Sequence, residues 1–176
     1  MSETRRRIRD AVARDPGIHF NAIVRDLALA RGQVQYHLRR LRESGSVVRH
    51  ERFGRTHYYP PAYDERERDA IAALRRETAA AVVAALCSRG STAPGDLVAT
   101  LEVPRSTLEH HLERLEACDL IERRRLPGNR VELVPVDHEA AVGLLEAIET
   151  DPRAAGVDRF ERLVDSLLEF GDGSGR

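Results

Sequence analysis

The sequence predicts a mainly helical fold with two small β-hairpins (α+β), built from one module that occurs twice. "VQYHLRRL" at residues 34–41 aligns without a gap with "LEHHLERL" at residues 108–115, an offset of 74. Apolar residues around both segments recur at the 3.6-residue spacing of amphipathic helices. Each segment is followed by two β-branched or aromatic runs that flank a glycine-containing turn, which is typical of a hairpin.

The first module is predicted to contain three short helices and a hairpin. Residues 4–14 are amphipathic, and "DPG" at residues 15–17 ends that helix. After the short extended piece "IHF", a second helix covers about residues 21–29. A third covers about residues 32–44, with Gly45 in the position of a C-terminal cap. The runs "VVRHE" and "THYYP" then flank "RFGR" as a hairpin. Three helices and a hairpin in this order make a winged helix-turn-helix.

The second module repeats this order. Residues 64–88 are expected to join the modules and to supply the first helix of the second one, with a break near residues 76–78. The next helix contains Pro94 in its first turn, and the third spans residues 104–118. "LIERRR" and "RVELV" form the second hairpin around "LPGN". The sequence therefore predicts two winged helix-turn-helix domains followed by C-terminal helices, with boundaries at 1–63, 64–136 and 137–176.

The C-terminal region carries an apolar seam. Its members recur at spacings of three and four and predict an amphipathic helix with dimerisation residues Val157, Phe160, Leu163, Val164 and Leu167. We expect this helix to pair across a two-fold axis in a homodimer, or to fold back onto its own second domain. The final residues "GDGSGR" are predicted to be disordered.

Composition excludes several classes of protein. The chain has no apolar run near the ~20 residues that span a bilayer, and it has only two cysteines, which fits the cytoplasm. Since its first residues lack an apolar stretch, we expect no signal peptide. All 28 basic residues are arginine. Residues 1–63 hold 13 Arg against 6 Asp and Glu, whereas residues 64–176 hold 15 Arg against 23 Asp and Glu. A basic first module on an acidic remainder suggests a polyanionic partner.

The segment "QVQYHLRRLRESGSVVRHERFGRTHYY" resembles the recognition helix and wing of ArsR/MarR-like transcriptional regulators. The similarity consists of a Val-x-x-His-Leu-x-x-Leu helix, a glycine, Val-Val, a Gly-Arg wing tip and Tyr-Tyr. The doubled arrangement is similar to soluble tandem regulators of haloarchaea and covers about residues 4–134. The resemblance implies a cytoplasmic, sequence-specific regulator of double-stranded DNA. We expect a repressor rather than an activator.

The third helix of the first module has one apolar face and one face suited to DNA. Val34, Leu38 and Leu41 point inward, and amides and arginines lie opposite or on the flanks. Glutamine can pair with adenine and arginine with guanine in the major groove, while other arginines bind phosphates. The candidate DNA contacts are Arg31, Gln33, Gln35, Tyr36, Arg39, Arg40 and Arg42 on the helix, and Arg52 and Arg55 in the wing.

The second module presents a different surface at the same positions. Glu109, His110 and Glu113 replace Gln35, Tyr36 and Arg39, and carboxylates facing phosphates would weaken binding. We therefore expect the second domain to supply an interface or an effector site. A histidine at the rim of the apolar face occurs in both modules, as His37 and His111. We interpret both as scaffold residues that pack and make a local hydrogen bond.

The sequence does not favour a redox disulfide, a metal site or an enzyme. Cys87 and Cys118 form no Cys-x-x-Cys and align with Ala13 and Ser44, so small packing residues explain them better than a disulfide or a metal site. No phosphate loop, nucleophile elbow or paired carboxylate indicates an enzyme, and we predict no cofactor and no metal. The alternative to a DNA-binding regulator is a winged-helix adaptor whose basic helix binds an acidic protein surface. A further effector or protein partner is left open.

Overall fold

The computed structural model describes residues 2–149, and the chain divides into two compact units, Met1–Ala72 and Ala73–Arg176. It is mainly helical and contains two small antiparallel hairpins, as the sequence predicts. Both units have the order of elements expected for a winged helix-turn-helix. Among the described residues, no helix is both long and apolar enough to cross a bilayer.

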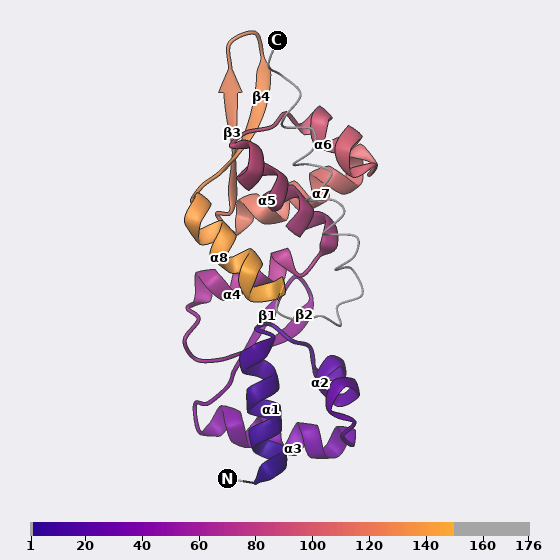
Figure 1. The fold of residues 1–176 in the computed structure, drawn as a ribbon, viewed down its shortest axis with the longest axis vertical. Helices are drawn as coiled ribbons and strands as arrows, with labels where there is room; N and C mark the ends of the chain where they lie inside the picture. Colours follow the sequence, from indigo (N-terminus) through magenta and orange to yellow (C-terminus); the bar gives the residue numbers. More distant parts are fainter. Residues whose placement is uncertain (1, 150–176) are drawn as a thin grey trace. The chain divides into compact units, whose positions relative to one another are not determined.

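The first unit packs three helices around an apolar core, with a hairpin on one side. Its elements are α1 (Glu3–Arg14), α2 (Phe20–Leu27), α3 (Arg31–Glu43), β1 (Val48–Arg52), β2 (Arg55–Tyr59) and α4 (Glu65–Leu74). Figure 1 shows α3 lying across the N-terminal part of α1, and α3 packs against both α1 and α2. The core consists of Ile8, Val12, Ile18, Ile23, Val34, Leu38, Leu41, Val47 and Tyr58. Burial of this apolar face fixes which side of α3 remains outward.

Local signals explain where α1 and α3 begin and end. The Ser2 hydroxyl accepts a hydrogen bond from the Arg5 backbone N–H and caps α1. Helix α3 begins after Ala30, which is extended. Beyond its last residue, Gly45 has φ +68°, and the Ser46 N–H donates to the Leu41 carbonyl at 2.8 Å. This is a Schellman cap, and glycine adopts the left-handed conformation at little cost.

The first hairpin is short and closed by a two-residue turn. Val48 pairs with Tyr59, and Arg52 pairs with Arg55. Phe53 and Gly54 between them both have positive φ, which is the mark of a type I′ turn. An isolated bridge joins Ile18 to Tyr58. The predicted extended piece after α1 therefore attaches the wing to the helices.

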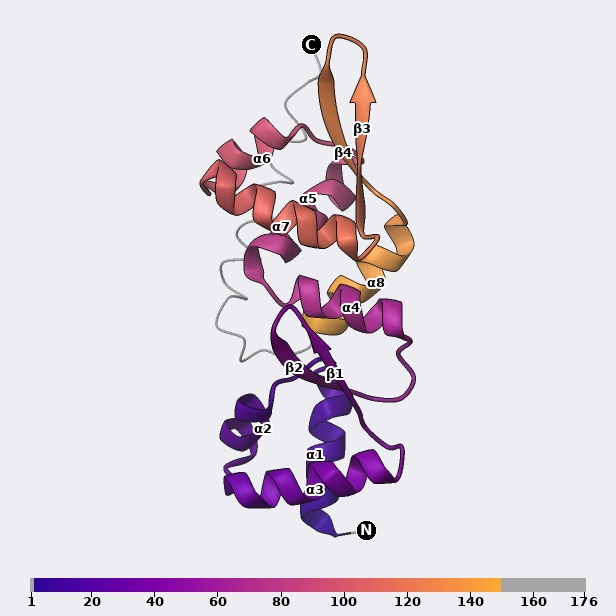
Figure 2. The same cartoon turned by 180° about the vertical axis from the view of Figure 1, so that it is seen from behind.

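The second unit surrounds one buried helix with three others and a hairpin. Its elements are α5 (Glu77–Arg89), α6 (Pro94–Leu101), α7 (Arg105–Ala117), β3 (Ile121–Leu126), β4 (Arg130–Pro135) and α8 (His138–Glu149). Helix α5 is buried along most of its length and packs against α6, α7, α8 and β4. The break before α5 lies at residues 75–76, close to the predicted position. Figure 2 shows the hairpin extending beyond the helices of this unit.

The two units repeat the same backbone conformation at unusual positions. Ala28 after α2 and Glu102 after α6 are both left-handed, with φ +51° and +52°. Gly45 after α3 corresponds to Asp119 after α7, with φ +54°. The second hairpin differs, because Leu126 pairs with Arg130 and its turn is therefore one residue longer.

The predicted dimerisation residues Val157, Phe160, Leu163, Val164 and Leu167, together with the predicted disordered tail, lie outside the described residues.

Candidate DNA-binding interface

The candidate interface is the outer face of α3. Val34, Leu38 and Leu41 are almost completely buried, as predicted. All seven predicted contacts on this helix are exposed: Arg31, Gln33, Gln35, Tyr36, Arg39, Arg40 and Arg42. The structure therefore brings them together on one helix, although their side chains differ in how strongly the protein itself holds them.

The two glutamines near the start of α3 differ in this respect. The Gln33 side-chain oxygen accepts a hydrogen bond from the Ala30 backbone N–H at 3.3 Å. Ala30 has no side-chain acceptor, so Gln33 supplies one half of a capping box. Within residues 2–149, the Gln35 side chain has no hydrogen bond. Of the two amides, only that of Gln35 is free to pair with a base without uncapping the helix.

Tyr36, Arg40 and Glu43 form a connected group on the same face. The Arg40 guanidinium lies 5.8 Å from the centre of the Tyr36 ring, and it donates to Glu43 at 3.3 Å. A hydrogen bond from Arg40 and its positive charge lower the pKa of the Tyr36 hydroxyl, with smaller contributions from Arg5 and Arg39. A more acidic phenol is a better hydrogen-bond donor, so Tyr36 is suited to a phosphate oxygen.

Arg39 is more exposed than its neighbour Arg40. Its side chain is 66% exposed, and its Nε lies 3.7 Å from a carboxylate oxygen of Glu43, one turn away. Ion pairs as exposed as this one hold a side chain only weakly. Arg39 can therefore leave Glu43 for a base or a phosphate.

The arginines at the two ends of α3 have different surroundings. Arg31 donates to the Asn21 side chain at 3.1 Å and lies over the Phe20 ring at 5.2 Å, which ties the start of α3 to α2. Arg42 is exposed near the other end. The sequence did not predict a role for Asn21, because a side-chain contact between α2 and α3 does not alter the residue pattern of either helix.

In the wing, Arg52 is held by the first unit itself. Its Nε lies 3.3 Å from Asp69 of α4, and its guanidinium lies 4.9 Å from the Phe53 ring centre. His50 Nε2 contacts the same carboxylate at 2.6 Å. By contrast, the Arg55 side chain is exposed. The candidate wing contacts are therefore unequal, since Arg52 has a carboxylate competing for it.

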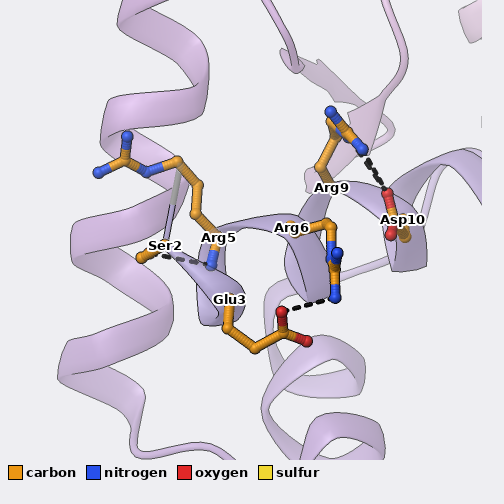
Figure 3. Close-up of polar contacts among 6 residues, drawn as sticks. All are labelled: Ser2, Glu3, Arg5, Arg6, Arg9 and Asp10. Carbon is orange, nitrogen blue, oxygen red and sulfur yellow. Dashed lines mark hydrogen bonds and ion pairs between the residues drawn. The ribbon is translucent and has the colours of Figure 1, made fainter.

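Helix α1 contributes a cation that the sequence pattern did not single out. Arg6 donates to Glu3 at 2.6 Å and Arg9 to Asp10 at 3.0 Å, so both are neutralised within their own helix. In Figure 3 the Arg5 side chain points away from α1, and it makes no such contact. The signal was its spacing: Arg5 lies three residues before the buried Ile8, on the side of α1 that packs against α3.

The corresponding face of α7 is neutralised from within the second unit. Arg123 of β3 donates to Glu109 at 2.7 Å and to both oxygens of Glu116 at 3.1 Å. The hydrogen bond that Arg123 donates to Glu109, followed by pairing with Glu116, raises the pKa of Arg123 further, so it stays charged. This Arg123 clamp occupies two carboxylates where α3 carries Gln35 and Arg42.

Comparison with known families agrees with this architecture. Residues 2–71 match a family model described as an N-terminal HTH domain, and residues 76–123 match the model of the bacterial regulatory protein, arsR family. The chain is a tandem helix-turn-helix transcription regulator. A solved structure titled "Structure of Disulfide formed AbfR" is 17% identical, covers 60% of this chain and 78% of its own, and has a TM-score of 0.40. Comparison with curated proteins found no match.

The two histidines at the rim of the apolar faces occupy similar places in the regulator. His37 lies edge-on to Tyr36 with ring centres 5.1 Å apart, and His111 lies in the same way against His110 at 5.7 Å. The predicted local hydrogen bond is wrong at Nδ1, which is buried in both rings and has no partner among residues 2–149. Packing alone accounts for their position.

Neither the cysteines nor the other potential metal ligands in residues 2–149 form a recognisable redox or metal site. Within residues 2–149, Cys87 and Cys118 form no disulfide, and both are half-buried. Burial raises the pKa of the Cys87 thiol, which makes it less reactive. Among the described residues, no three His, Cys, Asp or Glu side chains are arranged to hold a metal ion.

Proposed function

We propose that this regulator binds double-stranded DNA in a sequence-specific manner, with α3 in the major groove. Gln35 and Arg39 are the residues that we assign to base edges, because both are exposed and weakly held. Tyr36, Arg40, Arg42 and Arg31 are assigned to the backbone, which sets register but carries no sequence information. In the wing we assign the main contact to Arg55, whereas Arg52 has to leave Asp69 before it can contribute.

The observation that carries this proposal is the difference between α3 and α7. Both helices have the same fold and the same buried face. The outward positions carry Gln35, Tyr36 and Arg39 in α3, but acidic residues and His110 in α7. Because the buried faces of the two helices match while their outward faces differ, we infer that the outward residues of α3 were selected for the ligand that they bind. Amides, a phenol and arginines fit a polyanion with readable edges.

For the remaining parts of the chain we propose supporting roles. The second domain serves as an interface or an effector site, because α7 carries carboxylates, two of them paired with Arg123, where α3 carries its amide and arginines. The apolar seam at residues 157–167 joins two copies into a homodimer, which matches the symmetry of many operators. We propose repression in the cytoplasm as the mode, since blocking a promoter requires only occupancy of the site.

The experiment is selection of bound duplexes from a random pool with the full-length protein, followed by titration of the selected duplex at several salt concentrations. We expect a steep loss of affinity with salt, as for any protein that displaces counterions from phosphates. Arg39→Ala should cost about 1–3 kcal/mol at the selected site and relax base preference. Glu113→Ala, the matched change in α7, should leave binding unchanged.

The outcomes separate this proposal from its alternative. Failure to enrich any sequence, together with weak and salt-insensitive binding, would overturn it. Co-purification of an acidic protein without any DNA shift would then favour the adaptor. For the dimer, light scattering of the full chain should give twice the monomer mass, and Leu163→Asp should reduce it to one. A promoter reporter that rises when the gene is deleted would support repression.

A further inference from the structure

We propose that Arg5 of α1, together with Tyr36 and Arg40 of α3, forms a binding site for one backbone phosphate of duplex DNA at the edge of the reading face. This inference rests on the proposed DNA binding and assigns a role to a residue outside the recognition helix and wing. Its ligand is the phosphodiester and not a base, so it predicts affinity without sequence preference.

The three side chains converge from two helices that pack together. Helices α1 and α3 are in contact, and Figure 1 shows α3 beside the N-terminal end of α1. The Tyr36 side chain is 45% exposed, with the Arg40 guanidinium over its ring. Arg5 is close enough to lower the pKa of the Tyr36 hydroxyl. Both arginines therefore act on the Tyr36 hydroxyl, and all three side chains can donate hydrogen bonds to an anion.

Arg5 lacks the partners that its neighbours have. Its Nε is buried, and the side chain makes no hydrogen bond or ion pair with any residue in 2–149. Arg6 and Arg9 of the same helix are paired with Glu3 and Asp10 (Figure 3). A half-buried guanidinium without an acceptor is costly, and an arriving phosphate oxygen would supply the missing acceptor.

The second unit provides an internal control for the fold. Arg5 is the third residue of α1, and the third residue of α5 is Ala79, which is almost completely buried. The same scaffold therefore forms with alanine at this position. Tyr36 is likewise replaced by His110, whereas Arg40 is retained as Arg114. Arg5 and Tyr36 are therefore both absent from the unit whose α7 carries acidic residues. The fold of the module does not require an arginine at the position of Arg5.

The test compares full-length Arg5→Met with Arg6→Met on the selected duplex and on an unrelated duplex of the same length. Methionine keeps most of the aliphatic stem of arginine and removes its charge. Loss of one phosphate contact should flatten the slope of log affinity against log salt by about 0.9 and weaken binding about fivefold at 0.15 M salt. The loss should be equal on both duplexes. Arg6→Met should leave slope and affinity near those of the wild type, and Arg5→Lys should keep the wild-type slope.

A second measurement locates the contact. Duplexes with a single neutral methylphosphonate at each backbone position should contain one position that weakens the wild type about fivefold. The same position should weaken Arg5→Met clearly less, because the contribution of Arg5 is already lost while Tyr36 and Arg40 remain. An unchanged salt slope for Arg5→Met, or no such position, would overturn the phosphate site while the DNA-binding proposal stands. Absence of wild-type binding to any duplex would refute the proposed function itself. Thermal melting of each variant guards against misfolding. If Arg5→Met unfolds, Arg5→Ala, which matches Ala79 of the second unit, replaces it in the salt titration and in the methylphosphonate scan.

Discussion

Gln33 and Gln35 lie two residues apart on α3, and their exchange for alanine should have opposite consequences. The Gln33 oxygen accepts from the Ala30 N–H at 3.3 Å, a long and exposed cap, so Gln33→Ala should cost about 0.5 kcal/mol of folding free energy. In a domain of this size that corresponds to a fall in melting temperature of about 2–4 °C. Gln35 has no such bond to residues 2–149, and Gln35→Ala should leave the melting temperature unchanged.

DNA binding should show the reverse. A two-pronged pair between Gln35 and adenine is worth about 1–3 kcal/mol of discrimination, so Gln35→Ala should lose roughly 5- to 150-fold at the selected site. Gln33→Ala should lose little. Titration against a panel of duplexes, each with one base pair changed, measures the preference, and circular dichroism measures the melting temperature. If Gln33→Ala relaxes base preference more than Gln35→Ala, the assignment of Gln33 as the helix cap and of Gln35 as the base-contacting residue is refuted.

Three further predictions concern charges. Glu43→Gln should tighten DNA binding about two- to tenfold in titrations, because Arg39 and Arg40 lose their competing carboxylate, and weaker binding would contradict this. Arg123→Met should lower the unfolding free energy of the second domain in urea by about 1 kcal/mol, and the more exposed Arg124→Met serves as control. Burial, His110 and nearby arginines lower the pKa of His111, so the unfolded chain binds that proton more readily. Stability of the second domain should therefore fall as pH drops below about 6.5, and the urea midpoint of His111→Leu should depend less on pH.

The repeat and the helix faces could be predicted from the sequence because they depend on short-range periodicity. Val34, Leu38 and Leu41 follow the 3.6-residue period, and burial is its direct consequence. The cap at Gly45 could be predicted as well, because left-handed backbone selects strongly for glycine.

Partners of the site residues could not be predicted in this way. The pairing of Arg52 with Asp69, and of Arg123 with Glu116, depends on how elements pack in three dimensions. Arg5 shows the same limit, since its position relative to Tyr36 follows from the packing of α1 on α3. The two rim histidines show that a residue can recur in both modules without forming the expected hydrogen bond, since Nδ1 has no partner in either ring among residues 2–149.

The left-handed residues that end corresponding helices have a practical consequence. Ala28 and Glu102, like Gly45 and Asp119, keep the same dihedral sign although their side chains differ. These residues fix where α3 and α7 start and stop. The second unit therefore offers a backbone on which a second DNA-binding helix could be built. The design would place the outward residues of α3 on α7 at the constant offset of 74. It would also replace Arg123 and the carboxylates that Arg123 binds. We expect the resulting chain to have two DNA-binding helices whose sequence preferences can be changed separately.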